Sequence, residues 1–164
     1  MSMIEVEIAS IFVSLMHQSK VIILKEVDGD RYIPIFTAAE MAEAINLGLE
    51  KVSVPRPMTH DLLNNVITRL QGTVSHVVVS ALADSTFHAL INLDVKGKHL
   101  AIDARTTDAL ALAVRTDVRI FVEEAVMVEA AIKPEAGIDL SQEGEKEDLD
   151  AFDDFIGSLD LDDL

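Results

Sequence analysis

Residues 74–114, VSHVVVSALADSTFHALINLDVKGKHLAIDARTTDALALAV, contain the strongest pattern of strands and turns in this chain. Three runs rich in valine, isoleucine and leucine are separated by the turn sequences Asp84-Ser85 and Lys96-Gly97-Lys98. Short apolar runs bounded by such turns are typical of consecutive antiparallel strands. We therefore expect a three-stranded meander over residues 74–82, 87–95 and 99–103.

An alanine-rich segment follows the meander directly. Thr106 or Thr107 is suited to cap a helix here, because a hydroxyl oxygen accepts a hydrogen bond from an unsatisfied N–H group of the first turn. Ala109 and Ala113 are small enough to let this helix approach a sheet closely, and Leu112 adds apolar surface. The sequence thus predicts a helix packed on the meander.

Strand and helix signals alternate outside this stretch. Runs rich in isoleucine and valine predict strands, and apolar residues three or four positions apart predict helices. The expected strands cover residues 4–15, 20–27, 32–36 and 118–122, the expected helices cover 37–49, 59–70 and 123–132, and Asp28-Gly29-Asp30 turns a hairpin. This pattern predicts an α+β fold, a single compact domain with an antiparallel or mixed β-sheet packed by about three to four helices.

Cap residues define the two helices that precede the meander. Thr37 and Glu40 have the spacing of a capping box, and Thr59 is the natural N-cap of the next helix. In that next helix, five apolar residues are expected to face the core: Leu62, Leu63, Val66, Ile67 and Leu70.

Length and composition limit the classes of protein to consider. The chain has 164 residues, 49% of them hydrophobic, which suffices for a core without crosslinks. It contains no cysteine, which excludes disulfides, thiolate catalysis and cysteine-ligated zinc. The N-terminal residues lack the pattern of a signal peptide, and no stretch approaches the roughly 20 apolar residues of a membrane span. We expect a cytoplasmic protein without a membrane partner.

The net charge of −16 is unevenly distributed. Residues 134–164 contain twelve acidic residues and one lysine, whereas residues 1–133 contain 17 acidic and 12 basic residues. Binding to a phosphate backbone normally uses a stripe of basic residues, and this sequence has none. Any binding to DNA or RNA is therefore expected to be weak at physiological salt.

The same change in composition divides the chain into a body, residues 1–133, and an acidic linker and tail, residues 134–164. Within the tail, apolar residues recur at helical spacing, which indicates an amphipathic helix over residues 148–160. Two interpretations stay open. The tail is a solvated acidic segment, or its helix docks on a protein partner or on the body.

Two blocks concentrate arginine, hydroxyl and carboxylate groups near expected helix starts: residues 56–62, RPMTHDL, and residues 103–109, DARTTDA. Together with Leu112-Ala113-Val114-Arg115, they resemble the motifs of the bifunctional nuclease family. The resemblance covers about residues 4–132. It departs from the family pattern at Phe36-Thr37, where members often carry glycine, and at Thr107, where serine is usual. The resemblance implies cleavage of DNA and RNA.

Four residues of the two blocks and of the Leu112–Arg115 motif are candidates for binding the substrate phosphate. The free N–H groups and the dipole of a helix N-terminus favour an anion, and guanidinium groups neutralise charge that develops on phosphoryl oxygens. The candidate substrate-binding residues are Arg56, Thr59, Arg105 and Arg115.

Four further residues are candidates for the chemical step. A neutral imidazole can act as general base, and carboxylates can hold Mg²⁺ or Mn²⁺ through oxygen ligands. The candidate catalytic residues are His60, Asp61, Asp103 and Asp108, and the three aspartates are also the candidate metal ligands. No motif indicates an organic cofactor.

The same residues also fit a purely structural role. Asp61 and Asp108 would stabilise the helix starts, and the arginines could pair with the carboxylates in a buried ion-pair lattice. Two hypotheses therefore remain: a nuclease of DNA or RNA, and a non-catalytic, homo-oligomeric interaction module that uses its acidic tail to bind a protein. A homodimer or higher homo-oligomer is expected in both.

Deletion of residues 134–164 should leave the body folded, because the apolar runs that predict the core all lie before them. Thermal unfolding monitored by circular dichroism should remain cooperative in the truncated protein. Loss of the cooperative transition would show that the tail is part of the folded core.

Overall fold

The computed structural model describes residues 2–13 and 19–134. Its strands are β1 (Met3–Val13), β2 (Lys20–Glu26), β3 (Tyr32–Thr37), β4 (Gly72–Ala83), β5 (Thr86–Val95), β6 (Lys98–Arg105) and β7 (Arg119–Glu123). Its helices are α1 (Ala39–Leu49), α2 (Thr59–Arg69), α3 (Thr106–Thr116) and α4 (Glu124–Ala130). The helix expected over residues 148–160 lies outside the described residues.

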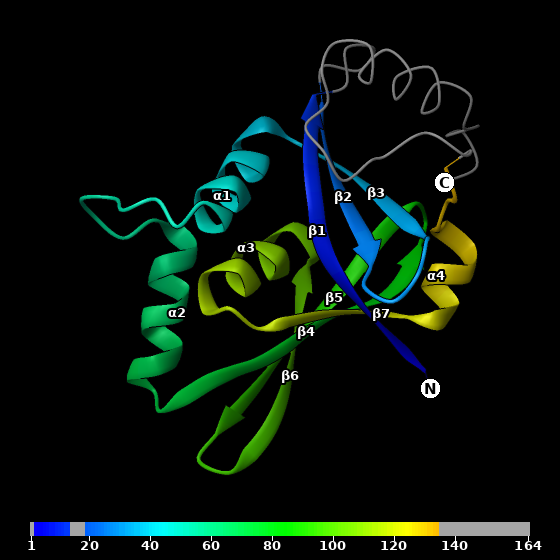
Figure 1. Cartoon of the computed structure of the whole chain (residues 1–164). Coiled ribbons are helices and arrows are strands. Elements are labelled where there is room, and N and C mark those ends of the chain that lie inside the picture. Colours follow the sequence, from blue (N-terminus) through cyan, green and yellow to red (C-terminus); the bar gives the residue numbers. More distant parts are fainter. Residues whose placement is uncertain (1, 14–18, 135–164) are drawn as a thin grey trace.

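The described strands form one mixed, curled sheet in the order β3-β2-β1-β7-β4-β5-β6 (Figure 1). Strands β4 and β7 are parallel, with Val77 opposite Ile120, and all other neighbouring strands are antiparallel. The expected hairpin, the expected meander and the α+β class are confirmed. Among the described helices, none is long and apolar enough to cross a membrane.

Helix α3 is the centre of the core. Five consecutive residues, Ala109 to Ala113, are almost completely buried, so the helix is enclosed on all sides. It contacts α1, α2 and strands β4 and β5, and Figure 1 shows it within the curve of the sheet. A helix that is apolar all round must be buried in this way, and its alanines permit the close approach that the sequence predicts.

The expected helix caps are wrong by one or two residues. Ala38, Met58 and Arg105 occupy the N-cap positions of α1, α2 and α3, in place of Thr37, Thr59 and Thr106 or Thr107. In α2, the Asp61 carboxylate accepts a hydrogen bond from the Met58 N–H group at 2.9 Å, so an acidic side chain at the third helical position satisfies the N-cap backbone. At α3, strand β6 continues directly into the helix, so the boundary falls on Arg105 in its extended conformation.

The expected inward face of α2 is only partly correct. Leu63 and Ile67 pack against the core, but Leu62, Val66 and Leu70 are exposed, Leu70 to 66%. The one fully buried residue of this helix is His60. The apolar pattern alone did not reveal that α2 has a neighbour on only one side, at the edge of the helical layer.

Gly48 allows α1 to approach α3 closely. A Cβ atom added at Gly48 would lie 2.5 Å from Val114 Cγ2 and 2.9 Å from Arg115 Nη1. Such a contact must displace one of the two side chains, because real Cβ atoms do not approach other atoms so closely. Gly48 therefore helps to set the position of Arg115.

Gly48→Ala should lower the free energy of unfolding by about 1–3 kcal/mol through overpacking, although alanine is intrinsically the better helix former by about 1 kcal/mol. Urea denaturation of Gly48→Ala, of Val114→Ala and of the double variant would measure the coupling free energy between the two positions. The double variant should lose less stability than the sum of the single losses. Additive losses would show that the two side chains do not compete for space.

Candidate functional site

The starts of α2 and α3, which carry the two polar blocks of the sequence, lie side by side. The link is a hydrogen bond of 2.9 Å between His60 Nε2 in α2 and Asp108 Oδ1 in α3. His60 is buried, whereas Asp108 is partly exposed. The structure thus brings together two of the four candidate catalytic residues, which lie 48 positions apart in the chain.

Arg105 extends this pair towards the surface. Its guanidinium donates to Asp108 through Nε at 2.6 Å from Oδ2 and through Nη2 at 3.2 Å from Oδ1. Two parallel bonds of this kind give a planar, bidentate ion pair. The Arg105 side chain is 72% exposed, so a polar chain runs from a solvent-facing cation through Asp108 to a buried imidazole.

The charge state of Asp108 follows from its surroundings. Burial raises the pKa of the Asp108 carboxyl, but the hydrogen bonds from Arg105 and His60 outweigh burial and hold the pKa below its ordinary value. Asp108 is therefore ionised at neutral pH and can only accept hydrogen bonds. When His60 is neutral, its proton must then sit on Nε2, which leaves the lone pair on Nδ1.

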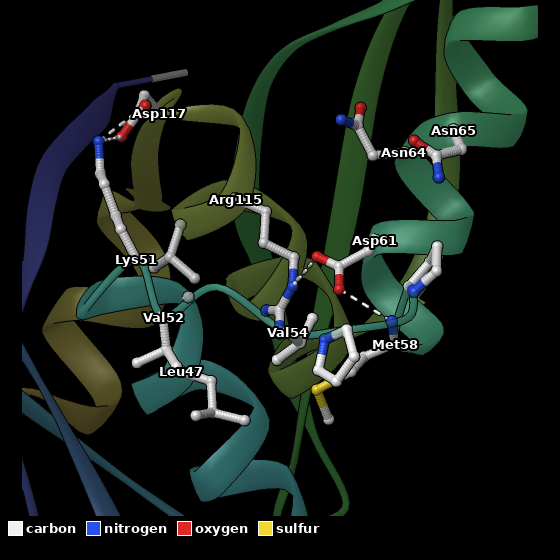
Figure 2. Close-up of a pocket in the computed structure, with 14 residues that line it drawn as sticks. Leu47, Lys51, Val52, Val54, Met58, Asp61, Asn64, Asn65, Arg115 and Asp117 are labelled. Atoms are coloured by element: carbon white, nitrogen blue, oxygen red, sulfur yellow. Dashed lines mark hydrogen bonds and ion pairs between the residues drawn. The ribbon is translucent and has the colours of Figure 1, made fainter.

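A second ion pair joins α2 to the end of α3. Arg115 Nε donates to Asp61 Oδ1 at 2.9 Å, and Arg115 Nη1 donates to the carbonyl oxygen of Ala111 at 2.8 Å. Figure 2 shows the two side chains pointing toward each other, with Asp61 also bonded to the backbone of Met58. The Arg115 side chain is only 8% exposed, so this pair is more enclosed than the Arg105–Asp108 pair.

Two cavities border these ion pairs. The first, of about 510 Å³, lies between the ends of α1 and α3 and the start of α2, and includes Asp61 and Arg115 in its wall (Figure 2). Its polar lining also includes Lys51, Asn64 and Asn65. The second, of about 540 Å³, begins at Arg105 and the first residues of α3 and extends over apolar residues of β3 and β5.

The remaining predicted site residues lie apart from this network. Arg56 is exposed and has no ion-pair partner among the described residues, and Thr59 is exposed at the first position of α2. Asp103 is exposed on β6. The ion pairs formed by the two candidate aspartates are Arg105 with Asp108 and Arg115 with Asp61, and neither involves Arg56.

The three candidate metal ligands do not gather. Within residues 2–13 and 19–134, no group of three or more histidines, aspartates and glutamates is close enough to hold a metal ion. The oxygens of Asp61 accept from Met58 and Arg115, and those of Asp108 accept from His60 and Arg105. A Mg²⁺ or Mn²⁺ ion would have to displace these donors, so the arrangement does not fit a preformed site.

Neither of the two cavities is predicted by the sequence patterns above. Asn64 and Asn65 follow Asp61 by three and four positions, the helical spacing that places side chains on one face, and this signal could have identified the first cavity. The second cavity had no such signal, because Phe36, Phe87 and Arg105 come from three separate segments.

Comparison with known proteins agrees with the resemblance drawn from the two blocks. The chain is 34% identical over 162 residues to two proteins of Mycobacterium tuberculosis, the uncharacterized protein MT1877 of strain CDC 1551 / Oshkosh and the uncharacterized protein Rv1829 of strain ATCC 25618 / H37Rv. Each alignment covers 98% of this chain and 97% of the relative. The family model described as bifunctional nuclease domain matches residues 22–135. The chain belongs to the bifunctional nuclease domain family.

Proposed function

We propose that this protein hydrolyses phosphodiester bonds of DNA or RNA, with Arg105, Asp108 and His60 as the reacting centre. The observation that carries the proposal is the continuous polar chain from the exposed Arg105 guanidinium to the buried His60 imidazole. Membership of a family named for nuclease activity supports the same reaction.

Each residue of the chain has a distinct role in the proposed reaction. The exposed Arg105 guanidinium neutralises charge on the non-bridging phosphate oxygens. Asp108 fixes the His60 tautomer, so that Nδ1 is the atom that takes a proton from the attacking water as its oxygen bonds to phosphorus. Because the His60 ring is buried, this step requires the start of α2 to admit water to Nδ1. The ester P–O bond then breaks, the leaving oxygen takes a proton from solvent water, and His60 returns its own proton to solvent. Asp61 and Arg115 position the start of α2, which carries His60.

Assistance by Mg²⁺ or Mn²⁺ and a cytoplasmic location remain predictions. The mildly acidic body predicts weak, salt-sensitive binding of the nucleic acid. No step of the proposed reaction is assigned to a metal ion, because the carboxylates are already occupied by protein donors.

One observation favours a second candidate function, a non-catalytic homo-oligomeric module. Asp61 and Asp108 each accept one hydrogen bond that joins α2 to α3, and their other bonds stabilise the two helix starts, as a structural lattice would require. The exposed apolar side chains of Leu62, Val66 and Leu70 on α2 would suit a protein partner better than a nucleic acid.

Cleavage of single-stranded and double-stranded DNA and RNA by highly purified protein, with Mg²⁺, Mn²⁺ or chelator, distinguishes the two candidates. His60→Asn should lower the cleavage rate by about 10²- to 10⁴-fold, the usual contribution of a general base, and Asp108→Asn should lower it comparably. Matched controls are His76→Asn, on β4, and Asp117→Asn, which pairs with Lys51 at the surface. Both controls should keep the wild-type rate.

Circular dichroism must show that each variant is folded. Equal cleavage rates in His60→Asn and His76→Asn would show that His60 is not the general base. Absence of cleavage by the wild-type protein under all metal conditions would favour the structural lattice.

A further inference from the structure

The second cavity combines apolar walls with a polar end. Its volume of about 540 Å³ is in the range of small-molecule sites. Phe36 at the end of β3, Phe87 at the start of β5 and Leu82 of β4 line the apolar part. Both phenylalanines are only half-buried. They therefore leave aromatic surface available to a flat ligand.

The polar end of this cavity is formed by Arg105, Thr106 and Thr107. Thr106 is only 4% exposed, and its buried hydroxyl has no hydrogen-bond partner among the described residues. An unsatisfied buried hydroxyl is costly unless a ligand or water completes it. Arg105 belongs at once to this cavity and to the proposed reacting centre.

We propose that this cavity receives an unpaired base of single-stranded nucleic acid, whose adjoining phosphate lies on Arg105. The assignment rests on the proposed function and specifies its substrate class. Aromatic side chains stack on any base that is free of its partner strand, whereas a duplex keeps its bases stacked inside. The Thr106 hydroxyl supplies a polar contact to the base edge or the sugar.

Binding measured without cleavage tests this assignment independently of catalysis. Fluorescence anisotropy with a labelled phosphorothioate oligonucleotide, in chelator and low salt, should show tighter binding of the single strand than of the duplex. Phe87→Leu should weaken single-strand binding on the order of tenfold, the usual effect of losing one stacked base. Phe121→Leu, on β7 and outside this cavity, is the matched control and should bind as the wild type does.

The outcomes separate this assignment from the nuclease proposal. Cleavage that persists while Phe87→Leu and Phe121→Leu bind equally would overturn the base site and leave the nuclease standing. Specific loss of binding in Phe87→Leu without any wild-type cleavage would support the site and overturn the nuclease. A preference for duplex would also overturn the base site.

A different observation concerns the two edges of the sheet. The β3 edge contains Pro34, which cannot donate a backbone hydrogen bond, and Tyr32 is bridged to Ile132. The β6 edge has neither protection: among the described residues it pairs only with β5, in a register without bulges. Strand edges left open in this way are templates for pairing with another chain.

Apolar side chains accompany this open edge. Leu100 and Ile102 are 44% and 46% exposed and lie directly opposite Leu93 and Ile91, which are buried in the core. Opposite residues of an antiparallel pair share one face of the sheet. Leu100 and Ile102 therefore continue the core face to the edge, where nothing within the described residues covers them.

We infer that β6 pairs antiparallel with β6 of a second copy, about a two-fold axis at Ala101. In this register Leu100 faces the partner's Ile102, and His99, which contacts Asp94 of its own chain, faces the partner's Asp103. Shifting the axis to Ile102 would place His99 against the partner's Arg105, and shifting it to Leu100 would place Lys98 against the partner's Ile102. Only the axis at Ala101 pairs apolar with apolar residues and acid with base.

A single introduced cysteine tests the register, because the full chain contains no cysteine. Ala101→Cys would face its own symmetry mate at a Cα separation of about 4.5–5.5 Å, which permits a disulfide. Asp103→Cys, on the same face of the strand, would lie on the order of 13 Å from its mate and serves as the control. Mild oxidation should crosslink the first variant and not the second.

Light scattering after size exclusion measures the association itself. The wild-type chain should be dimeric, and Ile102→Lys should raise the dimer Kd by about tenfold or more, because a charge would be buried opposite an apolar side chain. Val128→Lys, at an exposed position of α4, should leave the Kd unchanged. A monomeric wild-type chain, or crosslinking of Asp103→Cys as fast as of Ala101→Cys, would overturn the inference.

Discussion

The burial of α3 inside the curled sheet determines where the polar residues at its two ends lie. Ala109 to Ala113 have no exposed face, so the helix cannot rotate or slide without opening the core. Its two ends therefore present Asp108 and Arg115 at fixed positions. Helix α2 packs on the core through Leu63 and Ile67, and hydrogen bonds to Asp108 and Arg115 join its first turn to α3. The polar network is thus the candidate site and also joins the start of α2 to α3.

Sequence patterns predicted the fold well where the periodicity was local. The valine-rich and isoleucine-rich runs gave the meander and the hairpin, because strand period and turn residues lie within a few positions of one another. The predicted N-caps of α2 and α3 were wrong for two reasons. At α2 the Asp61 carboxylate bonds the N-cap backbone, and at α3 the strand β6 runs into the helix without a loop. The predicted inward face of α2 was partly wrong because the sequence pattern shows which residues are apolar but not which of them have a neighbouring element to pack against.

The sequence predicted which residues form the candidate site, but not which of them pair with one another. The two blocks predicted His60, Asp61, Arg105 and Asp108, and the motif over residues 112–115 predicted Arg115; all five lie in the network. Pairing Arg115 rather than Arg56 with Asp61 depends on the close approach of α1, α2 and α3, which no local signal encodes. Asp103 is close to Asp108 in the sequence, but it lies on β6 at the edge of the sheet and is exposed there.

Because β6 runs directly into α3, the number of residues at this junction determines how the side chains of the strand and the helix are oriented relative to each other. A strand turns its side chains by half a turn per residue, and a helix turns them by 100°. One residue inserted or removed at the junction would therefore either move Leu100 and Ile102 to the wrong face of the sheet or rotate Asp108 away from His60. Insertions and deletions should be tolerated in the turns before β6 and after α3. Related proteins should keep the strand and the helix together without a change of length between them.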